Sequence, residues 1–244
     1  MNPFKKETKQ LSIFTTAGYP KLNSLKKHIS LFEKNNIDFI EVGIPFSDPI
    51  ADGSIIQKTS EKALANGMNM DLIFNQLEEI ITDIPIVLMG YLNPVMTFGL
   101  DRFLEKCKHL NIRSVIIPDL SLEIYERFHK TMFESYQVYP VFIITPKTSN
   151  SRIIKIAESC VNSFVYLVSS NATTGANIEL RENNKRYAEI KSICTNTPVF
   201  IGFGIKTKLD VQRIQQSVDG AIIGSAFLAS VTRNEAAKFL EEIK

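Results

Sequence analysis

Cysteine is scarce in this sequence, which has three such residues, Cys107, Cys160 and Cys194, far apart along 244 residues. No CxxC pair occurs, which excludes a zinc site built from cysteine pairs and argues against a scaffold of disulfide bonds. Tryptophan is absent, which by itself says nothing about function. We expect the three cysteines to be small apolar residues within helices.

Neither sign of charge is in large excess. Lys and Arg number 28 and Asp and Glu number 26, for a formal net charge of +2. Such a balance gives no electrostatic attraction to nucleic acid or to an anionic membrane, so we expect neither as a partner. The content of 44% hydrophobic and 22% charged residues is typical of globular proteins and excludes disorder and fibrous repeats.

No apolar run is long enough to cross a bilayer. The longest, at 84–96, contains Pro and Asn and falls short of the roughly 20 residues that a span needs. The first ten residues contain lysines but no apolar segment typical of a secretory signal. The sequence therefore predicts a soluble, cytoplasmic protein.

Short apolar runs alternate with longer amphipathic segments along the whole chain. Near-continuous hydrophobicity is expected of parallel strands covered on both faces. Eight such units predict one α/β domain over residues 1–244, a closed (β/α)₈ barrel. The alternative, an open doubly wound sheet, usually has a GxGxxG turn after its first strand, and the TTAGYP turn lacks it. The predicted strands are 11–18, 38–45, 84–91, 114–119, 138–145, 162–169, 198–205 and 219–226.

Glu41 lies in the middle of an otherwise apolar predicted strand. Strand side chains alternate, so a carboxylate here faces the barrel interior or its mouth, where burial raises its pKa toward a value useful for proton transfer. The alternative is a buried ion pair, but no Lys or Arg occupies another predicted strand core. We therefore predict that Glu41 is catalytic.

Two aspartates, Asp48 and Asp52, follow in the long loop at 43–57. Loop aspartates commonly serve as helix caps or turn residues, and with Glu41 these also raise a divalent-metal hypothesis. We disfavour a metal, because no histidine is nearby. His28, His109 and His129 all fall in predicted outer helices, which argues against a Ser–His–Asp triad and a histidine zinc site.

Glycines at the ends of the last two predicted strands indicate a phosphate site. Gly202 and Gly204 end one strand, and Gly224 and Ser225 end the next, directly before a helical segment. Glycine lets backbone N–H groups approach an oxyanion, and a helix N-terminus adds partial positive charge. Simple tight turns are the alternative, but phosphate-binding barrels hold the anion at these two loops.

Aromatic and apolar residues at other strand ends predict a pocket for a flat apolar group beside the phosphate. They are Phe14, Met89, Tyr91, Asn93, Tyr166 and Phe203.

Several motifs, in this order on the predicted strand ends, resemble those of the tryptophan synthase alpha chain family over essentially the whole chain. They are FTTAGYP (14–20), IEVGIPFSDPIADG (40–53), GYLNP (90–94), VYLVSSNATTGA (165–176), GFGI (202–205) and GSA (224–226). The SDPxADG loop is quite specific to that family.

The resemblance implies a phosphate-binding TIM barrel that cleaves indole-3-glycerol phosphate to indole and glyceraldehyde 3-phosphate. It also implies a lyase without cofactor or metal of its own, paired with a pyridoxal-phosphate beta chain in an allosteric α2β2 heterotetramer. Glu41 matches the family's acid/base and Asp52 its second carboxylate, which we expect to accept the indole N–H. Tyr166 would assist Glu41. The other expected contacts are Gly175, Gly202, Gly204, Gly224 and Ser225 for the phosphate, Phe14, Met89, Tyr91 and Ile116 for the indole, and Thr174 for closure of its loop.

The chain departs from the family in the long loop at 169–184, where Ser170 replaces an arginine and Ala172 a glycine. This motivates a second hypothesis, a subunit that activates its partner but has weak or lost cleavage activity. A third, another phosphate-binding barrel such as a sugar-phosphate epimerase, would need inward-facing histidines and metal ligands. We expect Asn93, Pro94 and Asp119, with the loop at 43–57, at a partner interface. Asp119 is equally suited to cap a helix near Leu122.

Overall fold

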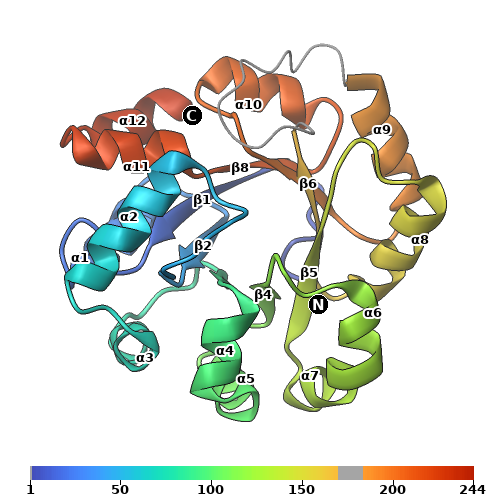
Figure 1. The fold of residues 1–244 in the computed structure, drawn as a ribbon. Coiled ribbons are helices and arrows are strands. Elements are labelled where there is room, and N and C mark those ends of the chain that lie inside the picture. Colours follow the sequence, from blue (N-terminus) through green and yellow to red (C-terminus); the bar gives the residue numbers. More distant parts are fainter. Residues whose placement is uncertain (1, 170–183) are drawn as a thin grey trace.

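The computed structural model describes residues 2–169 and 184–244, in which eight parallel strands form a closed barrel in sequence order (Figure 1). Each strand overlaps its predicted range, so the barrel prediction is confirmed. The strands are β1 (Gln10–Thr16), β2 (Phe39–Gly43), β3 (Ile86–Met89), β4 (Ser114–Ile116), β5 (Tyr139–Ile144), β6 (Val165–Val168), β7 (Val199–Gly202) and β8 (Gly220–Ile223).

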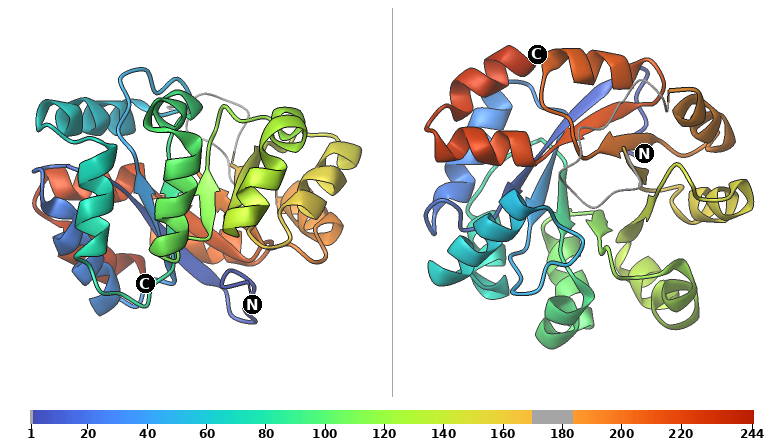
Figure 2. Two further views of the ribbon diagram at one scale, coloured as in Figure 1. Left: turned by 90° about the horizontal axis from the view of Figure 1, so that it is seen from below. Right: turned by 45° about the horizontal axis from the view of Figure 1, so that its top comes forward.

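Helices surround this barrel on its outside (Figure 2). They are α1 (Ser24–Lys34), α2 (Ser54–Ala65), α3 (Met70–Glu78), α4 (Leu92–Phe98), α5 (Leu100–His109), α6 (Leu122–Ile124), the π-helical turn η1 (Tyr125–His129), α7 (Lys130–Tyr136), α8 (Asn150–Ser159), α9 (Asn184–Ile193), α10 (Lys208–Gln215), α11 (Ser225–Thr232) and α12 (Ala236–Ile243). None of the helices in these two segments is long and apolar enough to span a membrane. The three cysteines are free and buried, with Cys107 in α5 and the other two directly after α8 and α9.

Strand alternation divides the core into two apolar clusters. On β1, Ile13 belongs to the outer cluster between strands and helices, and Phe14 to the inner cluster within the barrel. On β2, Phe39 is in the inner cluster, and Ile40 in the outer. Glu41 follows Phe39 by two residues, so the same alternation directs it into the barrel, where it pairs in register with Phe14.

The amino-terminal end of the barrel is filled by aromatic rings. Phe4, only 2% exposed, packs edge-on against Phe39 and Phe164 with ring centroids 5.1 and 4.9 Å apart. Phe200 lies 5.0 Å from Phe164 and completes the layer. The left-hand view of Figure 2 shows the amino terminus at the lower end of the barrel. The inner space is thus closed below, and a ligand has access from the carboxyl ends of the strands.

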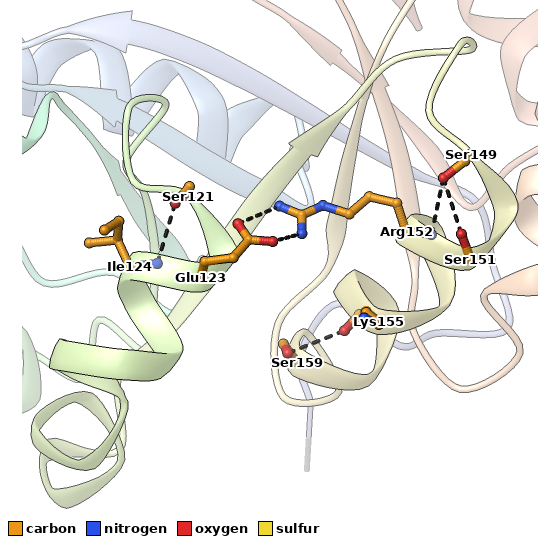
Figure 3. Close-up of polar contacts among 8 residues, drawn as sticks. All are labelled: Ser121, Glu123, Ile124, Ser149, Ser151, Arg152, Lys155 and Ser159. Carbon is orange, nitrogen blue, oxygen red and sulfur yellow. Dashed lines mark hydrogen bonds and ion pairs between the residues drawn. The ribbon is translucent and has the colours of Figure 1, made fainter.

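The helices after β4 and β5 are joined across the rim. Glu123 on α6 and Arg152 on α8 form a two-pronged ion pair (Figure 3). The guanidinium hydrogen bonds lower the pKa of the exposed Glu123 to about 2. Ser121 is the N-cap of α6, accepting from Ile124 N. Asp119 therefore does not cap α6. Its Oδ1 instead accepts a 2.8 Å hydrogen bond from Leu92 N at the start of α4.

Candidate active site

A cavity of about 330 Å³ lies at the carboxyl ends of the strands. Residues from β1, β2, β3, β6 and β8 and from the loops after β2, β7 and β8 line it. The residues predicted from sequence that share this lining are Phe14, Glu41, Asp52, Met89, Tyr166, Phe203, Gly204, Gly224 and Ser225. Carboxylates, apolar surface and glycine turns thus meet in one space.

Glu41 is a buried acid within this cavity. It is 1% exposed, and neither carboxyl oxygen has a hydrogen-bond partner in the described parts of the chain. Burial raises the pKa of Glu41 to about 8, because an apolar surrounding disfavours the charged form. The carboxyl group is therefore protonated at neutral pH and is able to donate a proton to a bound ligand.

Asp52 is held in place by Tyr91. The Tyr91 hydroxyl donates a 3.1 Å hydrogen bond to Asp52 Oδ2 and accepts one of 2.9 Å from Ala51 N. Burial raises the pKa of Asp52 to about 6, although the Tyr91 hydrogen bond lowers it. Its other oxygen, Oδ1, has no partner among the described residues. At neutral pH this carboxylate is charged and able to accept a hydrogen bond from a ligand N–H.

Tyr166 is 4% exposed and lies edge-on to Phe203, with ring centroids 6.2 Å apart. Burial raises the pKa of Tyr166 well above its usual value, and the charges of Glu41 and Asp52 raise it further. The phenol therefore stays protonated at neutral pH and offers one O–H donor inside the cavity.

The glycine turns meet where the loops after β7 and β8 approach each other. Phe203 and Gly204 both have positive φ, 72° and 75°, a conformation that favours glycine. Gly224 precedes α11, whose first residue is Ser225. The first N–H groups of a helix have no acceptor within it, so this end of the cavity suits an anion.

Only some of the apolar residues predicted to contact a flat group line the cavity. Phe14 and Met89 line the cavity, as does Phe203. Ile116 is fully buried in the inner cluster and does not line the cavity. Tyr91 does not line it either, but donates a hydrogen bond to Asp52, which does. Gly202 is also absent from the lining.

The remaining predicted residues contribute nothing that the structure describes at the cavity. Asp48 is exposed and accepts a hydrogen bond from Ser47 Oγ. It lines a separate depression with Pro49 and Lys58, and not the cavity that contains Glu41 and Asp52. The residues Ser170, Ala172, Thr174 and Gly175 lie outside the described residues.

Two cationic residues on the cavity wall, Lys206 and Arg233, do not stand out in the sequence. Lys206 follows Gly204 by two residues, and Arg233 directly follows α11. A basic residue after a strand or helix is ordinary on a protein surface. The position of Lys206 beside the predicted phosphate turn at Gly204 is a signal that could have identified it, whereas no such signal marks Arg233.

Comparison with known proteins gives matches over nearly the whole chain. The family model described as tryptophan synthase alpha chain matches residues 2–243. The tryptophan synthase alpha chain of Flavobacterium psychrophilum is 43% identical, covering 98% of this chain and 96% of the relative. That of Christiangramia forsetii is 40% identical over the same shares.

Solved structures agree with these relatives. Tryptophan synthase subunit alpha from Campylobacter jejuni superposes with a TM-score of 0.82 at 29% identity, covering 99% of this chain and 97% of that one. A chain of Mycobacterium tuberculosis tryptophan synthase gives a TM-score of 0.85 at 26% identity, covering 97% and 91%.

Proposed function

Because the chain belongs to the tryptophan synthase alpha chain family, we propose that Glu41, Asp52 and Tyr166 carry out the reaction of that family in this protein. The protein is a lyase that cleaves indole-3-glycerol phosphate to indole and glyceraldehyde 3-phosphate. This cleavage is a retro-aldol reaction and needs two proton transfers. The observation that carries the proposal is the buried Glu41, whose carboxyl oxygens have no hydrogen-bond partner among the described residues, in the cavity that ends at the glycine turns.

One carboxyl group serves both transfers. Glu41 first donates its proton to the indole carbon that bears the glycerol chain, which leaves Glu41 ionised and the ring positively charged. The Glu41 carboxylate then removes the proton of the adjacent glycerol hydroxyl. The carbon–carbon bond breaks, its electron pair returns to the ring, and the carbonyl group of glyceraldehyde 3-phosphate forms. Glu41 is protonated again at the end of the cycle.

Asp52 stabilises the intermediate charge. Its carboxylate accepts the indole N–H and lies in the same cavity as Glu41, so it opposes the positive charge on the ring. Below its pKa of about 6 this stabilisation is lost. The two carboxyl groups thus differ in protonation at neutral pH, which is how one site supplies an acid and a charge stabiliser.

The substrate is oriented from both ends. Phe14 and Met89 contact the indole, while Gly204, Gly224 and Ser225 bind the phosphate through backbone N–H groups and the Ser225 hydroxyl. Tyr166 donates its O–H toward the reacting atoms and helps to orient Glu41. The indole contact of Ile116 is indirect, because it packs in the layer that supports Met89.

A beta chain with pyridoxal phosphate is the proposed partner, in an α2β2 assembly that receives the indole. The proposed contact is the rim beside the strand-2 loop, where Ile50 is 81% and Met96 48% exposed. A depression is lined by Phe46, Asn93 and Pro94, which are close in sequence to Ile50 and Met96. Large exposed apolar side chains around a depression are typical of protein–protein contacts.

Indole release from indole-3-glycerol phosphate, measured with and without a beta chain, tests the proposal. We expect release by the chain alone and faster release with the partner. No release in either condition, with substrate still bound, would instead support a subunit that only activates its partner. The placement of Glu41 and Asp52 in one cavity does not favour that alternative.

A further inference from the structure

We propose that Lys206 is a phosphate-binding residue that determines how strongly this site prefers phosphorylated substrates. The inference rests on the proposed function and adds a residue to it. It starts from the charge of the ligand. A phosphate monoester carries about −1.5 to −2 charges near pH 7, whereas a helix N-terminus supplies only about half a positive charge. The glycine turns and α11 alone therefore leave most of the ligand charge uncompensated.

Among the residues that the structure describes, the charged ones on the cavity wall are Glu41, Asp52, Lys206 and Arg233. Neither acid supplies positive charge, so among these four residues only Lys206 and Arg233 can compensate the charge of the phosphate. Arg233 Nε is paired with Glu235 Oε2 at 2.7 Å and stands at the far end of α11 from Ser225. Lys206 has no ion-pair partner among the described residues, and it lies two residues from Gly204, beside the phosphate turn. Of the two cations, Lys206 is therefore the one whose charge is not neutralised by a neighbouring acid within the described parts of the chain and that lies beside the phosphate turn.

Hydrogen bonds hold the backbone around Lys206 in place before any ligand binds. Asp210 Oδ2 accepts hydrogen bonds from Lys206 N at 3.1 Å and Thr207 N at 3.0 Å, within a capping box at the start of α10. On the other side, Ser169 Oγ donates a 2.6 Å hydrogen bond to Phe203 O. A side chain that leaves an anchored backbone loses less freedom on binding a ligand than one on a loose loop.

The test compares Lys206→Gln with Lys208→Gln in the full chain. Lys208 is also exposed, carries the same charge two residues away and does not line the cavity, so it controls for net charge. We expect Lys206→Gln to raise KM for indole-3-glycerol phosphate about fivefold to tenfold, the worth of one charge-assisted contact. Its kcat should stay within about twofold, and Lys206→Arg should retain most of the affinity.

Three further measurements test whether the effect of Lys206→Gln comes from its contact with the phosphate group. For the dephosphorylated substrate, indole-3-glycerol, kcat/KM should be the same in wild type and Lys206→Gln. Competitive inhibition by inorganic phosphate should weaken in Lys206→Gln by the same factor as the KM change. The dependence of kcat/KM on salt concentration should be shallower in Lys206→Gln than in Lys208→Gln, because one ionic contact is lost. Arg233→Gln should have a smaller effect than Lys206→Gln.

The proposal is overturned if Lys206→Gln and Lys208→Gln give the same KM, or if Lys206→Gln weakens both substrates equally. Inorganic phosphate binding, measured by calorimetry, separates this failure from a failure of the proposed reaction. If the chain does not cleave the substrate but Lys206→Gln still weakens phosphate binding, the reaction assignment fails and the phosphate assignment stands. Thermal unfolding of both variants should match wild type, since both side chains are exposed.

Discussion

A Cβ atom added to Gly202 would lie 1.8 Å from the hydroxyl oxygen of Tyr166 and 2.4 Å from its Cζ. Tyr166 on β6 and Gly202 at the end of β7 are therefore in direct contact across neighbouring strands. The tyrosine ring occupies the space in which any other side chain at position 202 would begin. This contact accounts for the glycine independently of a phosphate, and it couples the shape of β7 to the position of Tyr166.

Gly202→Ala should displace the Tyr166 ring and lower both stability and kcat. Inserting a methyl group against a rigid buried ring costs about 1–3 kcal/mol of unfolding free energy, measured by urea unfolding. Adding Tyr166→Leu, which removes the ring, should recover part of that stability but not the activity. If Gly202→Ala instead raised KM alone, with stability unchanged, Gly202 would be a phosphate ligand and the steric account would be wrong.

The pH dependence of kcat/KM should be bell-shaped. Activity rises as Asp52 ionises, near its pKa of about 6, and falls as Glu41 loses its proton, near its pKa of about 8. The free enzyme has both groups in the required state between these values. The profile is measured with indole-3-glycerol phosphate from pH 5 to 9.5. A rate that keeps rising above pH 9 would contradict a proton donor at Glu41.

Tyr91→Phe should move the acidic limb of that profile to higher pH. The Tyr91 hydrogen bond favours the ionised form of Asp52, so its loss raises the pKa of Asp52 further. The alkaline limb should stay in place. Tyr136→Phe is the matched control, since it removes a 2.8 Å hydrogen bond to the surface residue Asp101. An unchanged acidic limb in Tyr91→Phe would show that Asp52 does not govern it.

His28 should make the fold sensitive to acid. It is 4% exposed on α1, and its Nδ1 lies 2.8 Å from Thr15 Oγ1. Burial, with a smaller effect of Lys27, lowers the pKa of His28 from 6.5 to about 4. Below pH 6.5 the unfolded chain takes up a proton that the folded chain does not accept until about pH 4. Stability is therefore present above pH 6.5 and lost on acidification toward pH 4.

The measurement compares urea unfolding of wild type, His28→Gln and His109→Gln at pH 7, 6, 5 and 4. Between pH 7 and pH 4, the unfolding free energy of wild type should fall by on the order of 1–3 kcal/mol more than that of His28→Gln. The exposed-site control His109→Gln should behave like wild type. Parallel losses in all three proteins would show that His28 is not the group responsible.

The fold was predictable because its signals are repeated. Every strand is an apolar run, and the alternation on β2 alone directs Glu41 inward with Phe39. Phe4, by contrast, is one aromatic residue before the first strand, and no periodicity predicts that it closes the barrel.

The site was predictable where chemistry and strand ends coincide, as at Glu41, Asp52 and Gly204. It was less predictable where tertiary packing determines which side chains are exposed to the cavity. Ile116 faces the interior as expected, yet neighbouring side chains cover it, and sequence does not reveal such depth. Asp119, in the loop after β4, accepts a hydrogen bond from Leu92 N at the start of α4. The two residues are 27 positions apart, so no local sequence pattern predicts this contact.

Single-turnover cleavage of indole-3-glycerol phosphate by Glu41→Gln measures whether Glu41 supplies the transferred proton. Glutamine keeps the size of the side chain and removes its transferable proton. We expect a loss of at least about 10²-fold in the cleavage rate, typical of removing a general acid–base, with substrate binding within a few-fold of wild type. Cleavage at a rate close to wild type, with binding intact, would show that the proton comes from another group.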